Sequence, residues 1–96
     1  METLRTFLAT EFGDAASFGE VRTRQERIAQ ISVESHRRVL RALDAVIADP
    51  PMDGSLAHLV GWDGNWVLDD PSDAGALQFL REIADMLREI IADAGR

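Results

Sequence analysis

The side chains of this chain that could do chemistry are two histidines, two tryptophans and seventeen acidic residues. Cysteine, tyrosine and lysine are absent, so the chain offers no thiolate ligand and no amine nucleophile. Ser55, His58 and Asp63 are the residue types of a Ser-His-acid hydrolytic triad. No sharp strand-to-helix turn presents the serine, however, and no glycine-rich segment offers an oxyanion hole. Both histidines are therefore interpreted as ordinary helix residues.

Metal binding is disfavoured on the same grounds. Two histidines without an HExxH or similar spacing do not make a zinc site. The run from Asp63 has some features of a calcium loop, but its sixth position is Leu68 instead of glycine and its twelfth is Ala74 instead of glutamate. A chain of this length also has little room for an enclosed ligand pocket. We expect no catalytic residue, cofactor or metal, and keep a small enzyme or ligand-binding bundle only as a third hypothesis.

The most unusual stretch is GWDGNWVLDDPSD, residues 61–73, which holds both tryptophans and four aspartates. Tryptophan and acidic groups at the centre of an interface can dominate binding. Alternatively, Trp62 and Trp66 cover the open end of the fold while the aspartates cap a helix. The two interpretations are compatible if one ring packs inward and the other stays exposed. The predicted partner-binding residues are Asp63, Trp66, Asp69, Asp70 and Asp73, with Glu11 and Asp14 as a second patch.

Charge is unevenly distributed along the chain. Residues 1–41 carry seven arginines against six acidic residues, and residues 42–96 carry three against eleven, which gives net charges of +1 and −8. An acidic surface repels phosphate backbones, so direct nucleic-acid binding is not expected. Such a surface would attract a basic protein and speed the encounter. It could also serve solubility alone.

The chain shows no targeting or membrane segment. Its N-terminus lacks a basic start followed by a long apolar run, and its longest apolar runs are only a few residues. The absence of cysteine suits a reducing compartment. We expect a cytoplasmic protein that does not enter a membrane.

The elements that must position these residues are helices. Apolar residues recur at helical spacing over 3–12, and Gly13 ends this segment. Ser17 and Glu20 form a capping box that opens a more polar helix over roughly 18–31, expected to be short or irregular near Gly19. Ser32 is the expected N-cap of the most amphipathic segment, which Pro50 and Pro51 stop.

Two more helices are expected in the second half. Asp53 or Ser55 can cap a short helix that Gly61 ends, and Asp63-Gly64-Asn65 is the one place for a short β ribbon. In the last helix, Asp70 suits the N-cap, with Pro71 at the first helical position and Asp73 at the third. The sequence predicts an all-α, single-domain bundle over residues 1–96, with about four to five helices.

The order of these segments resembles a known family. LRTFLATEFGDA is followed by SFGEVRTR, then by SVESHRRVLRALDAVIADP, the short SLAHLVG, an aromatic and acidic loop with Asp-Gly, and FLREIADMLREI. This order is similar to the small helical immunity proteins of bacterial contact-dependent growth inhibition systems, and the resemblance covers nearly the whole chain. It implies a stoichiometric inhibitor that binds the toxic domain of a delivered effector, often a nuclease with a basic active site. On this basis no enzymatic activity is expected.

A second hypothesis comes from a different class of protein. The last helix could carry more apolar side chains than a small core needs, namely those of Ile83, Leu87, Ile90 and Ile91. The chain would then be a structural or assembly module that pairs through apolar helix faces. The oligomeric state is open between a monomer and a weak dimer.

Overall fold

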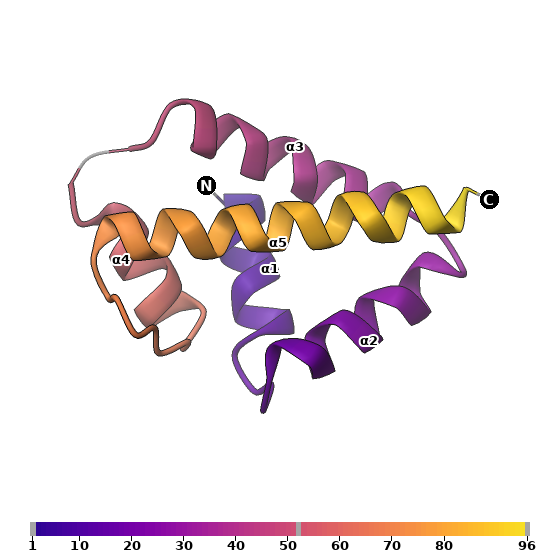
Figure 1. The fold of residues 1–96 in the computed structure, drawn as a ribbon, viewed down its shortest axis with the longest axis horizontal. Helices are drawn as coiled ribbons and strands as arrows, with labels where there is room; N and C mark the ends of the chain where they lie inside the picture. Colours follow the sequence, from indigo (N-terminus) through magenta and orange to yellow (C-terminus); the bar gives the residue numbers. More distant parts are fainter. Residues whose placement is uncertain (1, 52, 96) are drawn as a thin grey trace.

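Helices make up almost all of the regular structure in the part of the chain that the computed structural model describes, residues 2–51 and 53–95 (Figure 1). This part contains no β-strand. The prediction of an all-α bundle with four to five helices is therefore confirmed. The elements are α1 (Glu2–Glu11), α2 (Phe18–Ala29), α3 (Glu34–Ala48), α4 (Ser55–His58), the π-helical turn η1 (Leu59–Asp63) and α5 (Asp73–Ala94).

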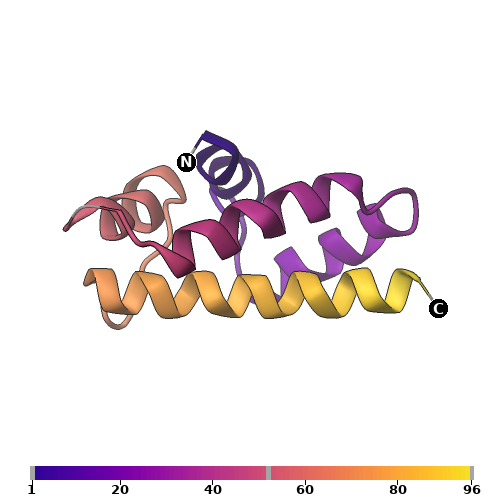
Figure 2. The ribbon, with the colours of Figure 1, turned by 90° about the horizontal axis from the view of Figure 1, so that it is seen from above.

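The long helix α5 organises the bundle. It contacts α2, α3 and α4 along its length, and α1 contacts α3 and η1. Viewed from above, α1 and α5 lie on opposite sides of the bundle (Figure 2). The turn η1 and the loop that follows it lie with α4 at the N-terminal end of α5 (Figure 1). No helix in the described ranges is both long and apolar enough to cross a membrane.

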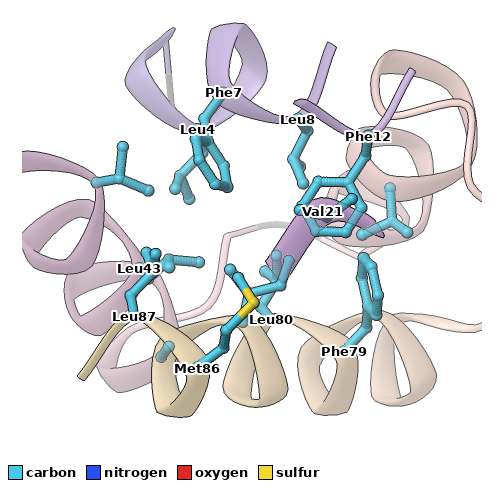
Figure 3. Close-up of a cluster of buried hydrophobic side chains, with 14 of the residues drawn as sticks. Leu4, Phe7, Leu8, Phe12, Val21, Leu43, Phe79, Leu80, Met86 and Leu87 are labelled. Atoms are coloured by element: carbon cyan, nitrogen blue, oxygen red, sulfur yellow. The ribbon is translucent and has the colours of Figure 1, made fainter. Parts of the chain in front are cut away.

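The core fills the space between α1 and α5. Leu4 and Leu8 of α1 point toward Leu80 and Leu87 of α5 (Figure 3), and all four side chains are at most 1% exposed. Burying a leucine side chain contributes about 1.5–3 kcal/mol relative to leaving it in water, so the predicted apolar stripes become the main stabilising contacts. The residues that motivate the self-association hypothesis face inward as well: Ile83, Leu87 and Ile90 are buried and Ile91 is half-buried.

The start of α2 follows the prediction and the start of α5 does not. Ser17 accepts a hydrogen bond from the Glu20 backbone N–H at 3.1 Å. The expectation that this helix is short or irregular near Gly19 is wrong, because α2 is regular through Gly19 and runs to Ala29. In α5 the N-cap is Ser72, whose hydroxyl accepts from the Gly75 N–H at 3.3 Å, so the helix begins at Asp73. The expectation that Asp70 caps this helix is wrong by two residues. The Asp70 carboxylate is already occupied by the N–H and hydroxyl of Ser72.

The start of α3 also differs slightly from expectation. Val33 occupies the N-cap position, and the Ser32 hydroxyl accepts from the Glu34 N–H at 3.2 Å. Ser32 therefore bonds a backbone N–H at this end, as a capping side chain does, from one residue before the cap itself. The helix ends at Ala48, before Pro50 and Pro51, as predicted.

The short α4 has the least expected start. Neither Asp53 nor Ser55 caps it: Gly54 holds the N-cap position with φ of 86°, a left-handed conformation that favours glycine. The Asp73 carboxylate, from the first turn of α5, accepts hydrogen bonds from the N–H groups of Gly54 and Ala57. A residue distant in sequence supplies the cap, which local pattern reading does not detect.

The helical path that begins in α4 continues past Gly61, although the sequence predicted that the helix would end there. η1 extends to Asp63, and the Gly64 N–H bonds the Leu59 carbonyl at 2.9 Å, the five-residue spacing of a π turn. The expected β ribbon is absent from residues 63–65. Asn65 follows instead, with φ of 49°, a left-handed conformation that asparagine tolerates.

Candidate functional site

Trp62 is the large aromatic side chain that the fold leaves in solvent. It is 77% exposed, although tryptophan is highly buried on average in folded proteins. Its ring stacks on the His58 ring, with centroids 6.0 Å apart and planes at 19°. The helical path from α4 into η1 places both side chains on one face. The His58 ring covers little of Trp62, so most of the apolar surface of the indole faces solvent.

Trp66 has the opposite environment. It is half-buried, with its ring centroid 5.1 Å from Phe12 in an edge-to-face contact and 5.7 Å from Phe79 in a stacked one. Both contacts are geometries that aromatic pairs prefer. Trp66, predicted as a partner-binding residue, therefore has a structural role that explains its presence. Its neighbour Val67 is 95% exposed and the structure gives it no packing role.

Two of the predicted aspartates hold the local fold together. Asp73 caps α4 by accepting hydrogen bonds from the backbone N–H groups of Gly54 and Ala57. These hydrogen bonds lower the pKa of the Asp73 carboxyl. Asp70 accepts from the Ser72 hydroxyl at 2.6 Å, and this bond together with the Ser72 N–H lowers the pKa of its carboxyl. The Asp70 backbone also passes so close to α5 that a Cβ at Gly75 would lie 2.0 Å from the Asp70 carbonyl oxygen. This part of the acidic loop is fixed in place.

Asp69 and Asp63 are the other two aspartates that the sequence predicted as partner-binding residues in this region. Asp69 is exposed, and its carboxylate makes no hydrogen bond or ion pair with any residue in the described ranges. The side chain of Asp63 lies outside what the structure describes. Asp69 is therefore the carboxylate in this loop that is free to meet a partner.

The sequence on both sides of Trp62 carries charge of a single sign. Residues 42–80 contain seven aspartates and no arginine or lysine. Within this stretch, α4, η1, the loop of residues 64–72 and the first turns of α5 lie together at one end of the molecule (Figure 1). We call these elements, residues 55–80, the acidic end. An exposed aromatic ring on it would meet a positively charged surface under favourable long-range attraction.

The second predicted patch is split by the fold. Asp14 is exposed in the turn after α1. Glu11, with a side chain only 9% exposed, is directed into the bundle, where its Oε2 lies 3.2 Å from Nε of Arg24. The turn contacts the acidic end, since the Asn65 side-chain amide donates to the Gly13 carbonyl at 3.2 Å. Asp14 thus borders the first candidate surface, and Glu11 belongs to the interior.

A buried polar network begins at Glu11. Nε2 of Gln25 donates to Glu11 Oε1 at 2.9 Å, and Oε1 of Gln25 lies 2.8 Å from Nε2 of His36. An ionised carboxylate only accepts hydrogen bonds, so the Gln25 amide must donate to Glu11 and present its oxygen to the histidine. The neutral His36 ring therefore carries its proton on Nε2. We call Arg24, Glu11, Gln25 and His36 the Glu11 network.

Two buried atoms of this network have no hydrogen-bond partner among the described residues. One is Oε2 of Glu11, which Arg24 approaches only as an ion pair, and the other is Nδ1 of His36. Burial lowers the pKa of His36, an effect that the charge of Glu11 partly opposes. The histidine is therefore neutral at pH 7, with an acceptor lone pair that no residue of the described ranges satisfies. An orphaned buried acceptor costs about 1–3 kcal/mol and calls for an explanation.

Sequence reasoning did not identify the network, although a signal was present. His36 lies three residues before Val39 and seven before Leu43, on the buried face of α3, and Gln25 lies four residues after Val21 on the buried face of α2. Polar residues at core positions of two neighbouring helices suggest a pair. What the pattern could not indicate was that Glu11 of a third helix completes it.

The described residues thus present an exposed ring on an acidic end and a buried polar network. No group of three His, Asp or Glu side chains within the described ranges is placed to hold a metal ion. Comparisons of the chain with protein-family models, with curated proteins and with solved structures find no match.

Proposed function

We propose that this chain is an immunity-type inhibitor that binds a basic protein domain through its acidic end. The observation that carries the proposal is Trp62, which is 77% exposed and stacks only on the exposed ring of His58. Tryptophan is among the residues most enriched at binding hot spots, where it fills a pocket of the partner. A tryptophan side chain has only two rotatable bonds, so it loses little side-chain entropy on binding, which favours affinity.

Charge supports a basic partner in particular. The acidic end lies within a stretch of 39 residues that carries seven aspartates and no cation. Complementary charge speeds association and suppresses wrong partners. A toxin nuclease fits this requirement because its active site must bind phosphates and is therefore basic. The order of segments, which resembles immunity proteins of contact-dependent growth inhibition, supports the same class.

The proposal predicts that the gene immediately upstream encodes a large secreted protein with a toxic C-terminal domain, and this domain is the test partner. The toxic domain is expressed alone or together with this chain, and cell survival and the dissociation constant are measured. We expect co-expression to restore growth. Trp62→Ala should raise the Kd about 30-fold or more, the loss typical of a hot-spot residue. Ile31→Ala is the matched control because Ile31 is 90% exposed and lies between α2 and α3, outside the acidic end.

The electrostatic component has its own control. Asp69→Asn and Glu34→Gln each remove one exposed negative charge, but only Asp69 belongs to the acidic end. We expect Asp69→Asn to lower the association rate and its salt dependence more than Glu34→Gln does. Equal effects would show that net charge alone matters, and unchanged binding by Trp62→Ala would refute the proposed surface.

A further inference from the structure

A groove opens between α1, α2 and α3, on a part of the molecule that the proposed function does not use. Its volume is about 390 Å³, which falls in the size range of small-ligand sites. Most of its surface is apolar, supplied by Phe7, Ile28 and Val39 from the three helices. The groove therefore has room for a small molecule with an apolar body.

Two residues that line this groove carry buried hydrogen-bond acceptors without a donor. The atoms are Oε2 of Glu11 and Nδ1 of His36. The other polar atom of each side chain is already bonded, since Glu11 Oε1 accepts from Nε2 of Gln25 at 2.9 Å and Nε2 of His36 donates to Oε1 of Gln25 at 2.8 Å. Gln25 thereby fixes both side chains. An unpaired buried acceptor is costly, and a ligand that supplies a donor removes this cost.

The chemistry of these two atoms determines what the ligand must carry. A carboxylate oxygen and an unprotonated ring nitrogen only accept hydrogen bonds, so they disfavour an anion and require N–H or O–H donors. A cation gains little further attraction, because the Glu11 carboxylate already faces the Arg24 guanidinium at 3.2 Å. Glu2 of the lining pairs with Arg5 at 3.1 Å, and Arg38 adds a positive charge to the lining. The groove therefore favours a neutral molecule with donors.

We propose that this groove binds a small neutral molecule with an apolar body and N–H donors, such as an aromatic primary amide. The apolar body packs against Phe7, Ile28 and Val39, and the N–H groups donate to Oε2 of Glu11 and Nδ1 of His36. Neither acceptor is open to solvent in the free protein, so the donor group reaches them by displacing the side chains that cover them. The few placed polar groups then orient the ligand in a mostly apolar site.

Benzamide, benzoate and benzamidinium are suitable probes because they share one planar shape and differ in donors and charge. Benzamide is neutral and has an NH2 group, benzoate is an anion without donors, and benzamidinium is a cation with donors on both nitrogens. Amide chemical shifts of the isotope-labelled protein are followed by NMR at about 0.15 M salt, which screens general attraction by the net charge of −7.

The three probes should differ in affinity. We expect benzamide to shift amides of α1, α2 and α3 around the groove, with a Kd on the order of 1 mM for a ligand of this size. Benzoate should bind about ten-fold or more weakly, because it leaves both acceptors unpaired and brings a like charge to Glu11. Benzamidinium should bind about three-fold or more weakly than benzamide, because its charge meets arginines whose carboxylates are already paired.

The nitrogen chemical shift of His36 Nδ1 reports the proposed bond directly, because an unprotonated ring nitrogen changes its shift when it accepts a hydrogen bond. We expect benzamide to move this resonance and benzoate to leave it in place. His58 is the internal control, since its ring is exposed on α4 and lies outside the groove. Its resonances should not move with either probe.

A pair of variants separates the groove from the rest of the surface. Thr6→Trp should fill the groove and raise the Kd for benzamide ten-fold or more, because Thr6 belongs to the lining. Ala9→Trp, on the same helix but outside the groove, should leave the Kd unchanged. Both positions are exposed, and circular dichroism confirms that each variant is folded.

Several results would overturn the proposal. These are absence of amide shifts at the groove, equal binding of benzoate and benzamide, and equal effects of the two tryptophan variants. Tighter binding of benzamidinium than of benzamide would overturn the neutral ligand. A His36 Nδ1 resonance that stays in place, or that is already typical of a hydrogen-bonded nitrogen in the free protein, would overturn the role of this acceptor. None of these measurements uses the acidic end, so either proposal can fail without the other.

Discussion

Gln25 is the side chain on which the buried network depends, and replacing it gives the sharpest test of the structure. It is 1% exposed and bridges two helices by bonding both Glu11 and His36. In Gln25→Met the side chain keeps nearly the same length, but the carboxylate oxygen of Glu11 and the Nε2–H of His36 lose their partner. Each orphaned group costs about 1–3 kcal/mol, so with partial relaxation we expect a loss of about 2–4 kcal/mol in the free energy of unfolding.

The measurement is urea unfolding followed by circular dichroism, supported by the thermal midpoint. For a domain of this size each kcal/mol shifts the midpoint by about 4–8 °C, so the expected decrease is about 8–32 °C. Gln78→Met is the matched control, because Gln78 is exposed on α5 and forms no hydrogen bond with residues of the described ranges. It should change the unfolding free energy by no more than about 0.5 kcal/mol.

A double variant tests the physical reason. His36→Leu removes the ring whose Nε2–H would be orphaned, so the loss in Gln25→Met/His36→Leu should be smaller than the sum of the two single losses by about 1 kcal/mol or more. Strict additivity would mean that the two side chains do not interact. Equal stabilities of Gln25→Met and Gln78→Met would refute the buried network altogether.

Three further predictions concern stability. Phe12→Ala should lower the free energy of unfolding in urea by about 3–5 kcal/mol, because this ring is fully buried and contacts the rings of Phe7, Phe18, Trp66 and Phe79. Val67→Ala, at a 95% exposed position, should lower it by less than about 0.5 kcal/mol. Similar losses in the two variants would contradict the aromatic core. Gly54→Ala should destabilise by about 1–2 kcal/mol, since φ of 86° strains any side chain although space is free; Gly61→Ala, which has free space and no such φ, should be neutral within about 0.5 kcal/mol, and equal effects would contradict the left-handed turn. The pKa of His36 is lowered from 6.5 by burial, so the unfolded chain takes up a proton at higher pH than the folded one. The contribution of the neutral histidine to the free energy of unfolding should be fully present above pH 6.5 and decrease as the pH falls below it. His36→Leu should flatten this part of the pH profile, which thermal melts measure.

Much of the fold could be predicted from the sequence because its determinants are local. Leucines and phenylalanines at helical spacing in α1 and α5 require a buried face, and Ser17 with Glu20 requires a helix start. Both signals depend on residues three or four apart and do not need the rest of the chain. The helical class, the approximate bounds and the apolar core follow from such signals.

The candidate site could be predicted only in part. The sequence left open whether one tryptophan would pack while the other stayed exposed, and the predicted contact residue was Trp66, whereas the exposed ring is Trp62. Trp66 packs because the left-handed turn at Asn65 directs the chain back over Phe12 and Phe79, and Trp62 remains outside because η1 continues the helical path beyond Gly61. Both are consequences of long-range contacts with α1 and α5, which no local pattern contains.

The sequence by itself determined the helices, the excess of acid after residue 41 and the residues available for chemistry. The tertiary structure decided the function open to each of them. Asp73, predicted on the partner-binding surface, caps α4 instead. Glu11, predicted in the second patch, lies in a network with Gln25 and His36. The reason is physical: half-buried carboxylates and the open N–H groups at a helix start are stabilised by hydrogen bonds, and here the partner that is near in space comes from a helix distant in sequence.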